Sequence, residues 1–397
     1  MWGVAVALYF VAVFHRMGLG VAALEAERRY HVAAGALSVF TAVQLGVYLA
    51  MQVPVGLAAD RIGPRRSLAA GMAAIAAGEA VFALSSSLAV GVAGRALVGL
   101  GDACVFINVL RVAHSWFPPR RAAVLTAVTS LIGAVGQLIS TFPLHVALDR
   151  AGWTATFAGA AALSALLAGA ALGLVRDAPR GSSAVAPRHA HDRIASTLRA
   201  AWAQPATRLG FWAHFGLMAP FVTMTALWGY PWLVEAQGIP GGTAAGWLAV
   251  AVAASVASAP VVGQVGARGP RAQTRAAVAV ATALVTVWTL VLAWPGAQPP
   301  HGLVLLGLAV SGAGAATAVT GFMLARAGNP AHVAGSASGL VNCGGFTAGA
   351  AAVLAAGLLL GHGARTATDF QHALAPMLAL SALGLVQLVR LARPAAR

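Results

Sequence analysis

The chain has 397 residues, of which 59% are hydrophobic and only 9% are charged. Soluble domains carry roughly 25% charged residues, so this composition excludes an ordinary soluble protein. The formal net charge is +15, but all 25 basic residues are arginines scattered between apolar runs, which excludes a basic groove for nucleic acid. Cys104 and Cys343 both lie in apolar segments without a partner at metal-ligand spacing, so no disulfide framework, metal site or cofactor site is expected.

Apolar runs of about 20 residues, each long enough to cross a bilayer as a helix, recur along the whole chain between glycine, proline and charged breaks. The first six predicted helices lie at 1–23, 36–59, 67–86, 89–112, 123–147 and 153–175. The second six lie at 208–233, 242–265, 274–294, 301–325, 332–360 and 371–391. We therefore expect an all-α membrane protein with 12 transmembrane helices.

The first apolar run is not expected to be a cleaved signal peptide. No basic residue precedes it, and His15 and Arg16 interrupt it. The chain enters this helix almost directly, which is compatible with a cytoplasmic lead upstream of Met1.

The longest polar stretch, 176–207, is rich in proline, glycine and serine and predicts a cytoplasmic linker between an N-terminal six-helix bundle (1–175) and a C-terminal one (208–397). Within it Ile194, Leu198 and Trp202 recur every four residues. This spacing predicts a short helix on the membrane surface, with a plain solvated loop as the alternative.

The arginines are distributed very unevenly between the two sets of loops. Nineteen of the 25 lie on the side of the linker, four lie on the opposite side, and Arg16 and Arg95 lie within helices. Cytoplasmic loops of membrane proteins retain arginine, so both termini are expected in the cytoplasm and the chain in the plasma (inner) membrane as a multi-pass protein.

The two halves repeat each other, as expected for two parallel six-helix repeats related by an axis along the membrane normal. The repeated residues are Pro54, Gly63 and Pro64, which return as Pro260, Gly269 and Pro270 at an offset of 206 residues, and Gly99 and Gly101, which return as Gly312 and Gly314 at an offset of 213.

Residues 56–66, with the sequence GLAADRIGPRR, resemble the signature loop between helices two and three of the major facilitator superfamily. Arg95 followed by Gly99 and Gly101 is similar to the family's fourth-helix motif. Gly133 and Gly136 match its antiporter motif only in part, because the usual proline is missing, which disfavours drug efflux. The resemblance implies a bacterial secondary transporter that works by alternating access.

Three further motifs resemble the branch of this family that carries organic and phosphorylated anions. They are Phe14-His15-Arg16, Trp116-Phe117-Pro118, and Gly152-Trp153 with Phe157. In those carriers an arginine of the first helix faces the central cavity, so the resemblance implies a contact between Arg16 and an anionic solute.

Four ionisable residues lie within predicted helices: Arg16, Glu79, Arg95 and Asp102. Each costs about 3 kcal/mol to insert near the bilayer centre, which makes each a functional candidate. The guanidinium of Arg16 offers a fork of donors that suits a carboxylate or phosphate of the solute. The alternatives for Arg16 are a structural pair with a helix terminus or with Asp102, or snorkelling towards the outer headgroups.

Arg95 and Asp102 are seven residues apart, about 10 Å along one helix face, so a direct bond between them is not expected. Asp102 is a candidate for the coupling proton, with a structural ion pair as the alternative; for Arg95 the ion pair is preferred. Glu79 is expected to form a salt bridge or to lie at the edge of the lumen rather than to contact the solute. His15 is expected at a helix interface, because adjacent helical positions point about 100° apart.

Other polar and aromatic positions are weaker candidates. Gln44 and Tyr48 belong to a polar stripe that lines the cavity or joins helices two and eleven. Gln137 and Asn342 are isolated polar residues in helices five and eleven. Trp228 and Tyr230 lie near a glycine and a proline and are candidates for a gate, with a membrane-interface aromatic belt as the alternative.

The loop after the second helix suggests a conformational latch, because a carboxylate at a helix end can pair with Arg111 or with the N-terminus of helix eleven in one conformation only. No acidic partner is evident at the cytoplasmic end of helix four. The latch candidates are Gly56, Asp60, Arg61, Gly63, Arg65 and Arg111.

The predicted function is secondary active transport by alternating access, proton-coupled, of a small anionic solute by a monomer. The alternative is proton-driven efflux of hydrophobic or cationic drugs. An enzyme is disfavoured because no Ser/His/Asp set, metal-ligand cluster or phosphate loop is evident. A channel is disfavoured because the six-plus-six repeat carries single buried charges rather than rings of charges.

Overall fold

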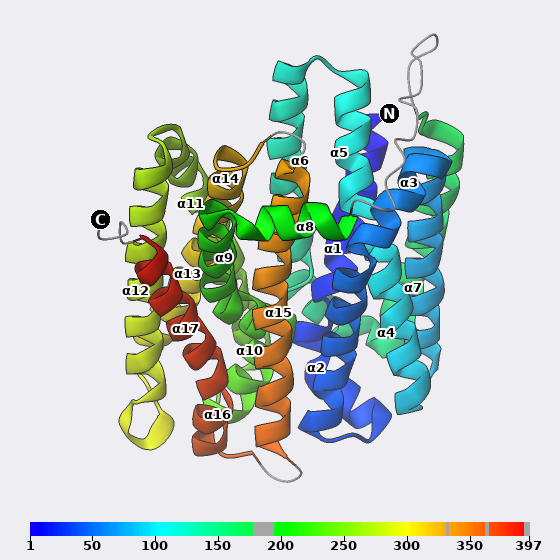
Figure 1. Ribbon diagram of the computed structural model, residues 1–397. Coiled ribbons are helices and arrows are strands. Elements are labelled where there is room, and N and C mark those ends of the chain that lie inside the picture. Colours follow the sequence, from blue (N-terminus) through cyan, green and yellow to red (C-terminus); the bar gives the residue numbers. More distant parts are fainter. Residues whose placement is uncertain (178–193, 331–332, 362–364, 393–397) are drawn as a thin grey trace. The chain divides into compact units, whose positions relative to one another are not determined.

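The computed structural model describes residues 1–177, 194–330, 333–361 and 365–392, and within these ranges the regular structure is helical throughout (Figure 1). The chain forms two compact units. One comprises Met1–Val32 and Val39–Arg188, and the other comprises Ala33–Ser38 and His189–Arg397.

Seven helical segments build the first unit, and only the first residues of the third segment, 34–38, are assigned to the other unit. They are α1 (Trp2–Met17), α2 (Leu19–Tyr30), α3 (Ala34–Leu84), α4 (Leu88–Ala103), α5 (Val105–Trp116), α6 (Pro119–Ile139) and α7 (Phe142–Leu174). Two of them contain a glycine with a positive φ: Gly63 in α3 (φ 81°) and Gly152 in α7 (φ 74°). The break at Gly63 separates the second and third predicted helices.

The fifth predicted helix is shorter than expected. It ends at Ile139 instead of continuing to residue 147, because Ser140 and Thr141 turn their hydroxyls back onto the carbonyls of Gln137 and Leu138, both at 2.6 Å. The next segment, α7, then begins with a proline in its first turn, where the missing N–H costs no hydrogen bond.

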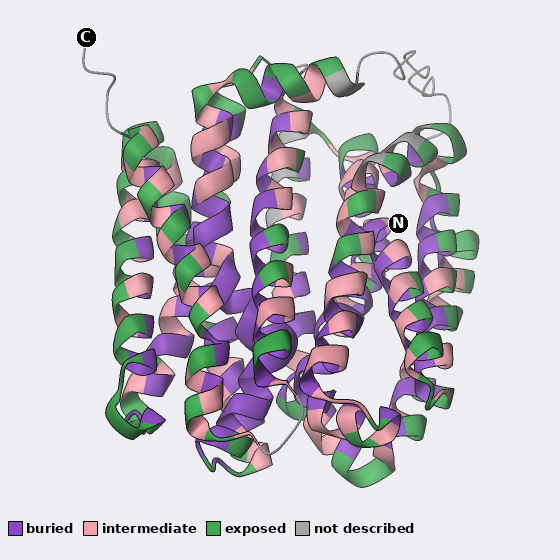
Figure 2. Ribbon diagram, turned by 60° about the horizontal axis from the view of Figure 1, so that its bottom comes forward, coloured by how far each residue is buried: buried purple, intermediate pink, exposed green. Residues whose placement is uncertain are grey.

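The second unit is longer in sequence. Its segments are α8 (Ile194–Ala203), α9 (Pro205–Thr223), η2 (Met224–Trp228), α10 (Gly229–Pro231), η3 (Trp232–Ala236), α11 (Gly241–Ala267), α12 (Pro270–Leu292), η4 (Pro295–Ala297), α13 (His301–Thr317), α14 (Val319–Ala327), α15 (Ala334–Leu360), α16 (Ala367–Ala373) and α17 (Ala375–Ala392). The segment Pro205–Ala236 forms the core of the unit, since 89% of its most apolar window is buried (Figure 2).

The helix of the linker is confirmed as a helix rather than a loop. Ala201 of α8 is fully buried in a cluster with Val333 and Val341, and the ring of Trp202 contacts that of Phe211 at 5.1 Å. The apolar side of α8 therefore packs against α9 and α15 of the same unit.

Ten stretches of the described chain are long and apolar enough to cross a membrane, or eleven when the bent pair α1 and α2 counts as one span. One of the ten, Val124–Leu174, is 51 residues long and contains parts of both α6 and α7. Each of the twelve predicted ranges contains helical residues in the part of the chain that the structure describes. The chain is therefore a multi-pass, all-α membrane protein.

The internal repeat is visible in the local backbone of the two units. Gly63 and Gly269 adopt nearly the same conformation (φ 81° and 91°), and each is followed by a proline that opens a helix. A Cβ at Gly99 would overlap the backbone carbonyl of Gln44, and one at Gly312 would overlap that of Ala251. The repeated glycines thus mark equivalent turns and equivalent close helix contacts.

Candidate functional site

Arg16 of α1 and Asp102 of α4 form a buried, bidentate ion pair in the first unit. The Nε of Arg16 lies 2.6 Å from Oδ2 of Asp102, and its Nη2 lies 2.7 Å from Oδ1. The Arg16 side chain is 7% exposed and that of Asp102 is 1% exposed, so both charges are buried inside the first unit. Tyr48 places the centre of its ring 4.7 Å from the guanidinium carbon of Arg16.

Both members of this pair lie beside an interruption of their helix. Arg16 is two residues before Gly18, where α1 and α2 meet at a bend of 48°, and Asp102 is two residues before Cys104, where α4 gives way to α5. A cation in the last turn of a helix is favoured by the helix dipole, whereas a carboxylate there is opposed by it. Asp102 therefore depends on the charge of Arg16.

A second buried group of charges lies next to this pair. The Nη1 of Arg95 is 3.4 Å from Oε2 of Glu79, and its Nη2 donates to the side-chain oxygen of Gln44 and, at 3.1 Å, to the carbonyl of His15. The Arg95 guanidinium also lies over the ring of Phe82 at 5.0 Å. Arg95 therefore ties α1, both parts of α3, and α4 together.

His15 is held between Glu79 and Ser164. The Ser164 hydroxyl donates to the carbonyl of Ala160 (3.1 Å), so the His15 Nε2, 2.8 Å from the same hydroxyl oxygen, acts as the donor in that contact. The other ring nitrogen, Nδ1, then faces Oε1 of Glu79 at 3.4 Å. His15 therefore connects α1 with the second part of α3 and with α7.

The structure brings several predicted residues together. Arg16 adopts the pairing with Asp102 that was one of its alternatives, and Glu79 forms a salt bridge, one of the two roles predicted for it. The ion pair of Arg95 is with Glu79 and that of Asp102 is with Arg16. Gln44 and Tyr48 both contact arginines of their own unit. The partners of His15 and Arg95 were not predicted, because spacing along a sequence does not reveal which helices meet.

The remaining candidates lie on α6 of the first unit and on helices of the second unit. Gln137 is buried on α6, and Asn342 is half-buried on α15 in the second unit. Trp228 is fully buried and donates to the carbonyl of Val353 at 2.8 Å, and Tyr230 is 7% exposed. Both aromatic side chains are packed inside the second unit, and their role as a gate or as part of a membrane-interface belt stays a prediction. Instead of breaking, the helix widens into the π-helical turns η2 and η3.

The latch candidates form two backbone contacts in the first unit. Arg111 donates to the carbonyl of Gly56 at 3.1 Å, and the backbone N–H of Arg65 donates to Oδ1 of Asp177 at 2.7 Å. Arg61 is exposed, and the side chain of Asp60 lies outside the described residues. Asp177 was not predicted as a partner. The one feature of the sequence that could have pointed to Asp177 is its position two residues after the end of the sixth predicted helix.

Within the described ranges no three histidine, cysteine, aspartate or glutamate side chains come together as a metal site. The model of the Major Facilitator Superfamily matches residues 5–354. The chain belongs to the major facilitator superfamily. Membership of this family points to a transporter rather than to an enzyme.

Three curated members of the superfamily resemble parts of the chain. The MFS-type transporter ppzB of Metarhizium majus is 29% identical over 144 residues (35% of this chain, 32% of the relative). A putative tartrate transporter of Agrobacterium vitis is 28% identical over 178 residues (43% and 41%). The probable sulfoacetate transporter SauU of Cupriavidus necator is 26% identical over 160 residues (39% and 36%). The matched parts thus span about a third to two fifths of these relatives.

Solved structures of the superfamily share the whole fold. The inward-facing, unoccupied structure of a bacterial homologue of the human lysosomal transporter Spinster superposes with a TM-score of 0.73, covering 98% of this chain and 94% of that protein at 14% identity. The nucleoside transporter NupG gives a TM-score of 0.74 at 13% identity, with 98% and 99% covered. At this identity the similarity establishes the fold alone.

Proposed function

We propose that this transporter carries a small anionic solute together with protons, by alternating access. The observation that supports the proposal is the bidentate ion pair between Arg16 and Asp102. An arginine fork that holds one carboxylate in this geometry suits the carboxylate, sulfonate or phosphate group of a solute equally well. The solute anion would replace Asp102 as the partner of Arg16.

This exchange of partners links the solute to a proton. When the solute takes over the guanidinium, Asp102 is left as a buried carboxylate without its counter-ion. Such a charge is strongly unfavourable in a membrane protein, and protonation removes it. Binding of the anion and of a proton therefore favour each other, which is the thermodynamic requirement for coupled transport.

The names of two relatives agree with an anionic cargo. Tartrate and sulfoacetate are both small organic anions, and the transporters named for them match up to 43% of this chain. The arginine distribution, nineteen against four, supports a plasma-membrane orientation with both termini in the cytoplasm. We expect the monomer to be the transporting unit, since the whole repeat lies within one chain.

The residues of the 56–66 loop are proposed to act as a latch at one end of the first unit. The Asp177 carboxylate accepts from the N–H of Arg65 in the first turn of a helix, and Arg111 holds the carbonyl of Gly56. Anions are favoured at helix N-termini, so Asp177 stabilises this arrangement of the loop. A movement of α5 or of the end of α7 would break these contacts, which makes them a feature of one conformation.

The substrate class is tested with purified protein and a panel of tartrate, sulfoacetate, a sugar phosphate, nitrate and a cationic dye, first by thermal shift and then by uptake into proteoliposomes. Arg16→Gln is expected to abolish saturable uptake of the anion that stabilises the wild type. Arg28→Gln, on an exposed arginine of α2, serves as the matched control and should retain uptake. Unchanged anion flux in Arg16→Gln would overturn the role of Arg16.

The same panel addresses efflux of hydrophobic or cationic compounds. An acidic binding site would select cations, and Asp102 is the buried acid of this site. Stabilisation by the dye and by none of the anions would therefore replace the anion proposal with drug efflux.

A further inference from the structure

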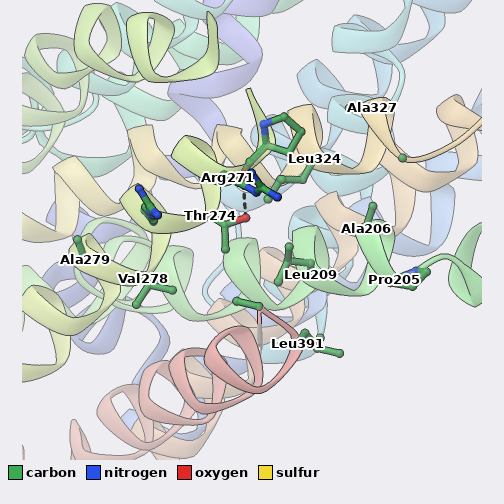
Figure 3. A pocket seen from close by; sticks show the side chains of 14 residues that line it. Pro205, Ala206, Leu209, Arg271, Thr274, Val278, Ala279, Leu324, Ala327 and Leu391 are labelled. Atoms are coloured by element: carbon green, nitrogen blue, oxygen red, sulfur yellow. Dashed lines mark hydrogen bonds between the residues drawn. The ribbon is translucent and has the colours of Figure 1, made fainter. Parts of the chain in front are cut away.

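The second unit contains a pocket of about 730 Å³ at the end where α12 begins (Figure 3). Side chains from α9, α12, α14 and α17 line it, and each of these helices belongs to a stretch able to span a membrane. The pocket is formed by the terminal turns of all four: the first turns of α9 and α12, and the last turns of α14 and α17. It therefore lies where helices leave the hydrocarbon and meet the lipid headgroups.

The pocket carries positive charge, and no acidic residue is among the side chains that line it. Arg271 and Arg275 of α12 line it, both are exposed, and neither has an acidic partner among the described residues. Between residues 194 and 392 the sequence holds only two acids, Glu235 and Asp369, and neither lines the pocket. Glu235 accepts from Arg365 at 2.7 Å, and Asp369 caps α16. The first turn of α12 adds its own partial positive charge.

The internal repeat places a comparable helix N-terminus in the first unit, and there the bound group can be seen. In the first unit, the helix that follows Gly63 receives the carboxylate of Asp177 at its N-terminus, and a Cβ at Gly63 would lie 2.6 Å from that carboxylate. Gly269 has the same backbone conformation before α12, yet nothing lies within 4 Å of a Cβ there. Asp177 follows the last helix of the first unit, whereas the last helix of the second unit ends at Leu391 and Ala392. The carboxylate that Asp177 provides after Gly63 thus has no equivalent among the described residues after Gly269.

The walls of the pocket suit a lipid better than a free ion. Leu209, Val278, Leu324 and Leu391 line it together with small alanines, so apolar surface continues from the arginines along the helices. Figure 3 shows these side chains arriving from four different helices around the opening. A soluble phosphate would leave this apolar surface exposed, whereas the acyl chains of a lipid would cover it.

We infer that this pocket binds an anionic phospholipid, with its phosphate on Arg271 and Arg275 and its acyl chains along the apolar walls. The inference is independent of the transported solute. A lipid held between the ends of α9, α12, α14 and α17 would stabilise the second unit in membranes rich in such lipids.

The test uses the full-length protein, delipidated in detergent, and measures lipid binding by native mass spectrometry and by thermal shift. The probes are phosphatidylglycerol, phosphatidylcholine with the same chains, and glycerol 1-phosphate as a soluble phosphate without acyl chains. Wild type is expected to bind phosphatidylglycerol and to gain thermal stability from it, and to gain nothing comparable from the other two.

Two pairs of variants separate specific binding from general charge. Arg271→Gln with Arg275→Gln should weaken phosphatidylglycerol binding by roughly tenfold or more, because both headgroup contacts are lost. Arg268→Gln with Arg326→Gln removes the same charge from exposed arginines that do not line the pocket and should bind as wild type does. Ala279→Phe, which fills the pocket but keeps both arginines, should also weaken binding.

Equal binding by both double variants would overturn the inference, as would equal stabilisation by phosphatidylcholine. Stabilisation by glycerol 1-phosphate that matches phosphatidylglycerol would replace the lipid with a soluble phosphate. Loss of solute transport in Arg16→Gln with unchanged lipid binding would leave this inference intact, so its failure and that of the proposed function are distinguishable.

Discussion

Glu79 of α3 and Arg95 of α4 form an ion pair at 3.4 Å in which both side chains are only 1% exposed. Arg95 reaches in addition the side chain of Gln44 and the backbone of His15. The contacts therefore join segments that are far apart in the sequence and that also carry Arg16 and Asp102. The position of the proposed solute site depends on this neighbouring network.

Glu79→Gln is expected to destabilise the protein strongly. It leaves Arg95 as a buried cation without its counter-ion, and breaking a buried pair in this way costs about 3–5 kcal/mol. Loss of the folded fraction on heating, followed by fluorescence-detected size exclusion, measures the effect.

The matched control is Glu235→Gln in the second unit. Glu235 also pairs with an arginine, Arg365 at 2.7 Å, but its side chain is 28% exposed. Exposed pairs contribute about 0–1 kcal/mol, so this variant should melt close to wild type. Equal melting temperatures for the two glutamine variants would show that the buried network does not stabilise the first unit.

Gly99→Ala should lower stability although alanine is the better helix former. A Cβ at this position would overlap the backbone carbonyl of Gln44, and the backbone cannot move away as a flexible side chain could. Gly159→Ala on α7 provides the comparison, because nothing lies within 4 Å of a Cβ there. That variant is expected to be neutral or more stable by up to about 1 kcal/mol. Equal melting temperatures for the two would contradict the close contact.

The elements of the fold could be predicted from apolar runs because lipid requires long helices whose backbone groups are paired internally. The repeat could also be predicted, since glycine is strongly favoured at a positive φ, and the conformation of Gly63 recurs at Gly269. The residues at which the helices end were harder to predict. The turn at Ser140 and Thr141 depends on hydroxyls bonding back to the chain, and such residues also occur inside membrane helices.

The members of the candidate site could be predicted more easily than their partners. Arg16, Glu79, Arg95 and Asp102 stand out because charges within apolar runs are costly. That Arg16 meets Asp102, and Arg95 meets Glu79, depends on how helices rotate and pack, which a single sequence does not encode locally. Ser164 and Asp177 were missed because one serine in a helix and one acid in a linker are both common.

Trp228→Phe separates a gate from a packing residue. The indole N–H of Trp228 donates to the carbonyl of Val353 at 2.8 Å, and the side chain is fully buried. Its loss should cost about 1–3 kcal/mol, because the buried carbonyl loses its partner. Trp294→Phe, on a side chain that is 37% exposed, should cost little.

For a gate, the transport rate per folded molecule should also change in Trp228→Phe. Uptake into proteoliposomes, normalised to the folded protein, measures that rate. An unchanged rate together with lowered stability would remove Trp228 from the gate and leave it as a residue that joins η2 to α15.

Asp102→Asn is expected to uncouple the solute from the proton. In the wild type, a lower pH on the side of the solute should increase uptake, because protonation of Asp102 releases Arg16 to the anion. Asparagine cannot take up that proton, so the variant should still exchange solute in counterflow but should not accumulate it in response to a pH gradient. Asp149→Asn, on an exposed acid of α7, should behave as wild type does. Accumulation driven by a pH gradient in Asp102→Asn would rule out Asp102 as the coupling site.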